Sequence, residues 1–286
     1  MSIIKYFFEF LIIIILFIFF KILGLKFASY VGGKLGNLFG PFFRSNKKIK
    51  SNVLRAFPNL ETNEIQKITN MMWNNYGRIL SEYMFIKKFR RSKFNYNITV
   101  IGQEILDKIK NGGEQVIFVS GHFNNFELMA MQIEKSGINL AAIYRPLNNI
   151  FVNIIMERIR KNYICKNQIK KGQSGIRELL FLFHKGHSIA LMIDQRLSEG
   201  IKSKFFGEEA YTTTMPAQFV KKFDCKIVPI YIERINGINF EMKVFEPIKY
   251  DKNIPTEKIT SDLNSWLERM ILNNPGQWIW SHDRWK

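Results

Sequence analysis

Cysteine, proline and glycine are scarce in this chain of 286 residues, and their scarcity excludes several classes of protein. The two cysteines, Cys165 and Cys225, lie far apart and form no CxxC pair, which excludes a disulfide framework and a zinc site and indicates reduced thiols in a cytosolic domain. Eight prolines and 18 glycines are too few for a low-complexity or collagen-like chain. With 47% hydrophobic residues, the sequence therefore predicts a folded chain with ample material for a buried core.

Acidic residues are also few relative to basic ones. There are 24 Asp and Glu against 42 Lys and Arg, which gives a formal net charge of +18. Such a chain is attracted to anionic partners, a class that includes nucleic acid, anionic lipid and acidic proteins. The cations are spread along the chain and accompany a membrane-type segment, which argues against nucleic-acid binding.

A long apolar stretch occupies the N-terminus. It runs from Ile3 to Leu25, is interrupted only by Lys5, Glu9 and Lys21, and contains an unbroken apolar run from Phe10 to Phe20. At about 1.5 Å per helical residue, the longer stretch crosses a hydrocarbon core of roughly 30 Å if its lysines extend to the interface. We therefore expect residues 1–25 to form a membrane-anchor helix.

The residues after the apolar stretch indicate how this helix is used. No A-x-A-like cleavage site follows it, which favours an uncleaved anchor over a signal peptide. Basic residues follow closely, as is typical of a cytoplasmic segment against anionic headgroups: Lys26, Lys34, Arg44, Lys47, Lys48 and Lys50. We expect residues 26–286 to form a single α/β domain with a helical N-terminal part, on the cytoplasmic side of the membrane.

Hydrophobic periodicity then divides the chain into elements. Apolar residues at spacings of three and four predict helices over residues 51 to 95, whereas short apolar runs bounded by turn residues predict strands beyond Gly113. The predicted strands are Gln115 to Ser120, Asn139 to Tyr144, Ser188 to Ile193, Ile227 to Glu233 and Asn239 to Phe245. The predicted helices are Phe126 to Ser136, Asn149 to Asn162, Ser174 to Lys185, Pro216 to Phe223 and Thr256 to Leu272. This alternation predicts a mainly parallel mixed sheet flanked by helices.

The peptide G-H-F-N-N-F-E, from Gly121 to Glu127, directly follows a predicted strand, where α/β sheets place their sites. Its histidine and glutamate are five residues apart, so one continuous helix would turn them roughly 140° away from each other. If His122 lies in the turn before the helix and Glu127 in its first turns, the carboxylate can orient the imidazole, which would then take a proton from a hydroxyl. Alternatively, His122 satisfies backbone groups at a helix start and Glu127 meets the helix dipole.

Several further peptides, together with this one, resemble the late acyltransferases of lipid A biosynthesis over nearly the whole chain. They are I-Y-R-P-L-N-N at Ile143 to Asn149, D-Q-R at Asp194 to Arg196, F-F-G-E-E-A-Y-T-T-T-M-P-A at Phe205 to Ala217, and the C-terminal P-G-Q-W-I-W-S-H-D-R-W-K. The N-terminal anchor also matches. Met215 stands where the family pattern has glycine, which puts the local turn and the channel width in question.

The resemblance implies a membrane-bound enzyme of the bacterial inner membrane that transfers an acyl chain from acyl-carrier protein to a hydroxyl of Kdo-bearing lipid IVA. It implies His122 as the general base with Glu127 as its partner, and no metal or cofactor beyond the acyl thioester donor. The oxyanion formed on the thioester carbonyl needs fixed donors, which backbone N–H groups or Arg145 would supply.

Other residues are candidates for binding the acceptor. Asp194, Gln195 and Arg196 follow a predicted strand at the same sheet edge, where a carboxylate would orient Arg145 or bind a sugar hydroxyl. The phosphates and carboxylates of the acceptor require cations. Candidates by position are Arg177, Arg196, Lys202, Lys204, His282 and Arg284.

Three other functions differ from this one in the motifs that they require. The chain has no Walker A and no G-x-G-x-x-G motif, and G-Q-S-G-I at Gly172 lacks the second glycine of a nucleophile elbow, so serine hydrolysis is disfavoured. A glycerophosphate-type lysolipid acyltransferase shares an H-x4-acid motif, usually with Asp as the acid. A membrane-tethered lipid-binding module with an inert histidine–glutamate pair is a third possibility.

Overall fold

A mixed β-sheet forms the centre of the computed structural model, which describes residues 2–91 and 97–286. Within these residues the sheet has seven strands in the order β1-β9-β8-β2-β5-β3-β4. They are β1 (Ile98–Ile101), β2 (Val116–Ser120), β3 (Leu140–Tyr144), β4 (Asn167–Lys170), β5 (Ser188–Met192), β8 (Lys226–Asn236) and β9 (Asn239–Val244). The pairs β8–β2, β2–β5, β5–β3 and β3–β4 are parallel, and β8–β9 is an antiparallel hairpin. The predicted mainly parallel sheet is therefore confirmed.

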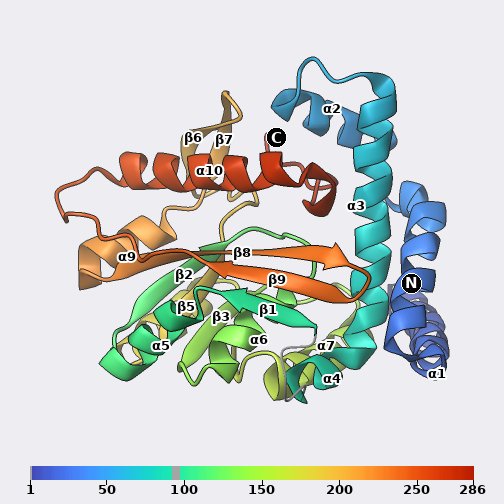
Figure 1. Ribbon diagram of the computed structural model, residues 1–286, viewed down its shortest axis with the longest axis horizontal. Coiled ribbons are helices and arrows are strands. Elements are labelled where there is room, and N and C mark those ends of the chain that lie inside the picture. The colour runs from blue at the N-terminus through green and yellow to red at the C-terminus, as the bar shows by residue number, and fades with distance from the viewer. Residues whose placement is uncertain (1, 92–96) are drawn as a thin grey trace.

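Helices cover both faces of this sheet (Figure 1). In that view α10 (Thr256–Asn273) lies above the strands, α9 (Met215–Phe223) lies at their left end, and α5 (Gln103–Gly112), α6 (Glu127–Lys135) and α7 (Ile150–Tyr163) lie towards the bottom. The helix α8 (Gln173–His184) also packs on the sheet, against β3, β4 and β5. Because both faces are covered, β2 is buried along its whole length, which explains why the sequence V-I-F-V-S is almost continuously apolar.

A small antiparallel hairpin and the C-terminal residues pack together beside α10. The hairpin consists of β6 (Ile201–Phe205) and β7 (Glu208–Thr212). The fully buried Arg284 donates hydrogen bonds to the carbonyl oxygen of Tyr211 and to Oγ1 of Thr212, and its guanidinium lies over the Phe205 ring. The C-terminal peptide is thereby fixed to the hairpin.

The N-terminal helix α1 (Ser2–Phe43) is kinked at Gly24, whose φ of 73° is incompatible with a continuous helix. It is the one helix in the described residues that is long and apolar enough to cross a membrane. The expected anchor of residues 1–25 thus ends beside the kink, although the helix itself continues, and residue 1 lies outside the described residues. The boundary at residue 25 stays a prediction.

Beyond the kink, α1 runs alongside α3 (Thr62–Glu82), as Figure 1 shows. A methyl group added at Gly77 of α3 would lie 1.9 Å from the carbonyl oxygen of Gly32, and one added at Gly36 would lie 2.2 Å from that of Trp73. The two backbones are therefore in direct contact, as in helix pairs with small residues at their interface. The helical prediction for residues 51 to 95 is confirmed by α2 (Asn46–Ala56), α3 and α4 (Ile86–Arg91), and its last part, residues 92–96, lies outside the described residues.

Candidate active site

The loop between β2 and α6 carries the histidine that the sequence singles out. His122 lies at the carboxyl edge of the sheet, directly after β2, and the chain turns before α6 begins at Glu127. Asn124 makes this turn with a φ of 43°, in the left-handed region that asparagine tolerates better than most residues. The neighbouring parallel strand β5 ends at the same edge and is followed by Asp194, so the topology brings the two residues together.

His122 and Asp194 form a close pair. Nδ1 of His122 lies 2.8 Å from Oδ1 of Asp194, and the backbone N–H of His122 donates to Oδ2 at 2.8 Å. The indole N–H of Trp278 also donates to Oδ2, at 2.9 Å. The Asp194 side chain is fully buried, whereas that of His122 keeps 19% of its surface exposed, which leaves the imidazole accessible to a substrate.

The electrostatics of this pair favour an imidazolium next to a carboxylate. Burial alone would raise the pKa of Asp194, but the charge of His122 and the hydrogen bonds from His122 and Trp278 outweigh it and hold that pKa at about 2. Burial alone would lower the pKa of His122, but the charge and hydrogen bond of Asp194 raise it above the usual 6.5. When His122 is neutral, its contact with the Asp194 carboxylate places the remaining proton on Nδ1 and leaves Nε2 unprotonated, the form that acts as a general base.

Two side chains border the imidazole of His122, and one of them lies at Nε2. The side-chain nitrogen of Gln195 lies 3.4 Å from it, and the Phe126 ring stands edge-on to the imidazole with 4.7 Å between ring centroids. Gln195 is thus beside the imidazole at the sheet edge, as its position after the strand suggests.

The expected pairing of His122 with Glu127 is wrong. Glu127 opens α6 and accepts hydrogen bonds through Oε1 from Nε and Nη2 of Arg160 on α7, at 2.9 and 2.5 Å, and from the Tyr83 hydroxyl at 3.1 Å. The helix start directs this carboxylate towards α7, and the imidazole takes its carboxylate from the end of the neighbouring strand instead. Glu127 acts on His122 only through its charge, which contributes to the raised pKa of the imidazole.

The ion pair of Glu127 and Arg160 is largely removed from water, with side chains 9% and 12% exposed. Burial opposes the charge of Arg160, but the carboxylate of Glu127 keeps the pKa of the guanidinium above its usual value. Arg160 and Tyr83 were not among the predicted site residues. No motif marks them, because they reach Glu127 from α7 and from the end of α3 only in the folded chain.

The C-terminal peptide P-G-Q-W-I-W holds the His122 loop in place. The backbone N–H of Asn124 donates to the carbonyl oxygen of Gln277 at 2.8 Å, and the Asn124 side chain donates to the Gln277 side-chain oxygen. Trp278, the next residue, supplies one of the three donors to Asp194. The sequence identified this peptide as part of the family pattern, and the structure gives its function as a brace for both members of the pair.

Among the described residues, no hydrogen bond or ion pair joins Arg145, Arg177, Arg196 or Lys204 to the His122–Asp194 pair. Arg145 follows β3, the strand next to β5, and is exposed without a hydrogen bond or ion pair to the described residues. Arg196 donates to the carbonyl oxygen of Lys286 and to Ser198. Arg177 on α8 and Lys204 on β6 are exposed. Their roles in binding substrate stay predictions.

Arg284 requires a correction. It was expected to be a cation for the acceptor, but it is 0% exposed and its guanidinium is bonded to the hairpin β6–β7. Burial lowers its pKa to about 10. This arginine therefore stabilises the fold and is not available to a ligand.

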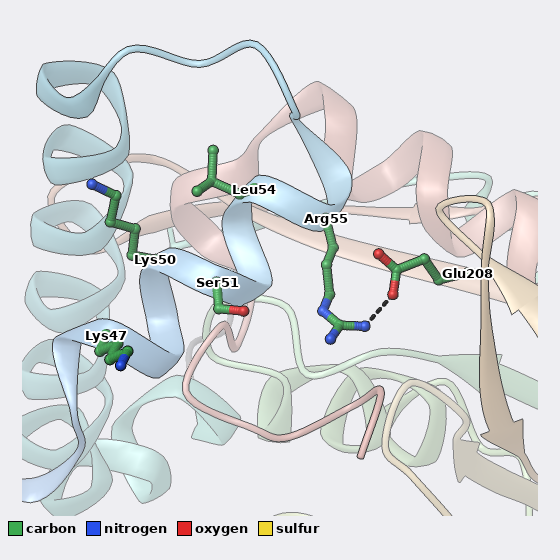
Figure 2. Close-up of a pocket in the computed structure, with 6 residues that line it drawn as sticks. All are labelled: Lys47, Lys50, Ser51, Leu54, Arg55 and Glu208. Carbon is green, nitrogen blue, oxygen red and sulfur yellow. Dashed lines mark hydrogen bonds and ion pairs between the residues drawn. The ribbon is translucent and has the colours of Figure 1, made fainter.

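A basic cavity lies at some remove from this pair, on α2. It has a volume of about 480 Å³ and is lined by Lys47, Lys50, Ser51, Leu54, Arg55 and Glu208, of which Arg55 and Glu208 form an ion pair (Figure 2). The described residues that line it do not include His122 or Asp194. Across the described ranges, no group of three or more His, Cys, Asp or Glu side chains is placed to hold a metal ion.

Fold and site together define a class: an α/β protein with a histidine–aspartate pair at the carboxyl edge of a parallel sheet and an apolar N-terminal helix. The sequence profile of the bacterial lipid A biosynthesis acyltransferases matches residues 1–286, so the chain belongs to that family. It is therefore an O-acyltransferase of lipid A biosynthesis.

Named relatives agree with this assignment. The lipid A biosynthesis palmitoleoyltransferase of Escherichia coli (strain K12) is 21% identical over 264 residues, covering 90% of this chain and 84% of the relative. The lauroyltransferase of the same organism is 23% identical over 267 residues, with the same coverage. Among solved structures, the 1-acyl-sn-glycerophosphate acyltransferase of Thermotoga maritima aligns with a TM-score of 0.38 and 15% identity, over 87% of this chain and 93% of that one.

Proposed function

We propose that His122 is the general base for acyl transfer from acyl-carrier protein to a hydroxyl of a lipid A precursor, and that Asp194 is the carboxylate that orients it. The observation that supports this most directly is the 2.8 Å contact between Nδ1 of His122 and Asp194, which places the proton of the neutral imidazole on Nδ1 and leaves Nε2 unprotonated on a partly exposed side chain. Nε2 removes the hydroxyl proton, the oxygen forms a bond to the thioester carbonyl carbon, and the C–S bond breaks. The departing sulfur takes the proton back from His122.

The negative charge that forms on the thioester carbonyl oxygen needs hydrogen-bond donors in place. Arg145 is the proposed donor, together with backbone N–H groups of the sheet edge. The position of Arg145 supports this role. Arg145 follows β3, which is adjacent to β5, and the Arg145 guanidinium has no partner among the described residues.

The proposed donor is the thioester of acyl-carrier protein, with no further cofactor. Acyl-carrier protein is acidic, so a strongly basic partner attracts it. The net charge of +18 and the lysine-rich cavity on α2 support this choice.

We place the enzyme in the bacterial inner membrane with its catalytic domain on the cytoplasmic side. The apolar helix α1 and the cluster of lysines that follows it in α2 support this orientation. Lipid IVA bearing Kdo sugars is the proposed acceptor.

The test is a mass-spectrometric assay of the purified full chain with acyl-carrier protein thioesters and three acceptors: lipid IVA, its Kdo derivative and lysophosphatidic acid. We expect acylated lipid IVA or Kdo-lipid IVA with the wild type, none with His122→Ala, and normal product with His184→Ala, which removes an exposed histidine of α8. Turnover by folded His122→Ala would refute the base assignment. Acylation of lysophosphatidic acid alone would refute the acceptor.

A further inference from the structure

A second cavity lies where α1, α3, the His122 loop and the β8–β9 turn meet. Its volume is about 420 Å³. Its lining is unusually rich in amides, with six asparagines and Gln277 among the described residues around it. Each primary amide offers both donors and an acceptor, a combination that matches the hydroxyl groups of a sugar.

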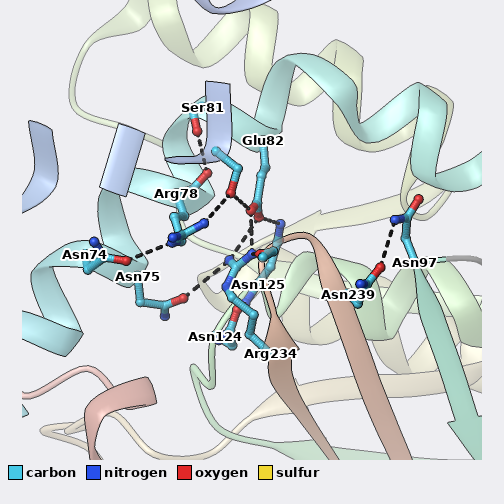
Figure 3. A network of polar contacts seen from close by, with 12 residues as sticks. Asn74, Asn75, Arg78, Ser81, Glu82, Asn97, Asn124, Asn125, Arg234 and Asn239 are labelled. Atoms are coloured by element: carbon cyan, nitrogen blue, oxygen red, sulfur yellow. Dashed lines mark hydrogen bonds and ion pairs between the residues drawn. The ribbon is translucent and has the colours of Figure 1, made fainter. Parts of the chain in front are cut away.

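The charges beside this cavity do not cancel. Arg234 is held by both carboxylate oxygens of the fully buried Glu82, at 2.5 and 3.1 Å (Figure 3). Arg78 has only neutral partners: its Nε donates to Asn74 at 2.7 Å and its Nη1 donates to Ser29 at 3.0 Å. Two guanidiniums therefore share one carboxylate, which leaves one positive charge without a counter-ion among the described residues.

Two observations show that the positive charges of Arg78 and Arg234 are poorly compensated. Burial and the nearby charge of Arg234 lower the pKa of Arg78. The Arg234 side chain is only 8% exposed, and its Nε lacks a hydrogen-bond partner among the described residues. An anion bound beside Arg78 would supply the counter-charge that this guanidinium lacks.

The rim of the cavity is apolar and lies beside the membrane helix. Met71 and Ile235 line it and are 50% and 57% exposed. On α1, Asn37 lines the cavity and is followed by the exposed Leu38 and Phe39. A polar interior with an apolar rim beside a membrane helix suits a lipid whose headgroup is polar and whose chains remain outside.

The cavity is also connected to the catalytic pair. Asn124, which lines it, is two residues after His122, and Gln277, which also lines it, precedes the Trp278 that donates to Asp194. A headgroup held here would contact the same loop and peptide that position the imidazole.

We infer that this cavity binds the anionic sugar headgroup of a membrane lipid, with the amides binding its hydroxyls and Arg78 its charged group. This assignment rests on the proposed function, under which the bound lipid is the acceptor of the acyl chain.

The test measures lipid IVA binding to the full chain carrying His122→Ala, so that no turnover occurs, in a detergent that contains no sugar. Two further variants are compared in this background. Asn74→Asp places a carboxylate beside Arg78 while retaining its hydrogen-bond acceptor, and Arg78→Gln removes the charge. Lys67→Gln removes an exposed cation from the same helix and is the matched control.

We expect Asn74→Asp and Arg78→Gln each to weaken binding at least tenfold, and Lys67→Gln to change it less than twofold. Glucosamine 1-phosphate should compete better than inorganic phosphate, and phosphatidylglycerol vesicles should compete poorly. Unchanged binding by Asn74→Asp, or equal competition by phosphate or phosphatidylglycerol, would overturn the sugar-headgroup site. Wild-type chain that binds lipid IVA through this cavity but does not acylate it would instead overturn the proposed function alone.

Discussion

Asp194 accepts hydrogen bonds from both the backbone N–H and the imidazole of His122, each at 2.8 Å. The ring is therefore fixed at two points by one carboxylate, whose own position is set by Trp278. Such double anchoring defines both the orientation and the tautomer of the imidazole.

Replacing Asp194 by Asn should retain the shape of the site but invert the tautomer. The amide would donate to Nδ1 and leave the proton on Nε2, so that His122 could no longer accept a proton from a hydroxyl. We expect kcat to fall by roughly 10²–10⁴ with little change in KM. Asp224→Asn, at an exposed left-handed position that asparagine tolerates, is the control and should retain full activity. Comparable kcat for both variants would contradict the assignment of Asp194.

The raised pKa of His122 predicts where activity is lost on acidification. Only the neutral imidazole acts as a base, so kcat/KM should fall as pH drops through a value above 6.5. In Asp194→Asn the burial effect is no longer outweighed, so the residual activity should be lost at a lower pH than in the wild type. A pH profile of both proteins with the same thioester checks this. Profiles with the same midpoint would argue against His122 as the titrating group.

The same shift has a consequence for stability. A pKa raised on folding means that the folded state binds the proton more tightly than the unfolded one. His122 therefore adds to the free energy of unfolding. This stabilisation is fully present below about pH 6.5 and is lost as the pH rises through the folded pKa of His122.

Glu127 should matter first for stability, because it neutralises the buried Arg160. Glu127→Gln leaves that guanidinium unpaired, and we expect the free energy of unfolding to fall by about 3–5 kcal/mol. Arg160→Gln should have a similar effect, and the double variant should be less destabilised than the sum of the two, by about 1 kcal/mol or more. Thermal unfolding in detergent measures all three.

The pH profile separates this role from a direct contact with His122. Because Glu127 acts on the imidazole only by its charge, Glu127→Gln should move the acidic midpoint of kcat/KM less than Asp194→Asn does. A larger shift in the Glu127 variant would show that this carboxylate, and not Asp194, orients the imidazole.

The sequence predicted the five inner strands of the sheet, β9, β8, β2, β5 and β3, and missed the two edge strands, β1 and β4. β2 and β5 read as continuous apolar runs because helices cover both of their faces, whereas β1 and β4 are the short edge strands and N-Q-I-K of β4 buries one side chain. The hairpin β6–β7 was missed because its exposed face is charged.

In the site, too, local sequence locates some residues, whereas only the fold brings their partners to them. His122 could be located from its position after a buried strand, since that is a local property of the chain. Its partner could not, because the pairing with Asp194 depends on which strand lies next to β2 in the sheet. Arg160 and Gln277 reach the site across similarly long separations in sequence, for which a single sequence contains no spacing signal.

The contact between α1 and α3 provides a test of how the membrane helix is attached to the catalytic domain. A methyl group at Gly77 would lie 1.9 Å from the carbonyl oxygen of Gly32, so the two helices must separate to admit it. We expect Gly77→Ala to destabilise the chain by about 1–3 kcal/mol through overpacking. Gly112→Ala, where the added methyl group meets no atom within 4 Å, should be neutral or stabilise by up to about 1 kcal/mol. Thermal unfolding of both variants in detergent decides the matter, because equal midpoints would show that the backbones of α1 and α3 are not in contact.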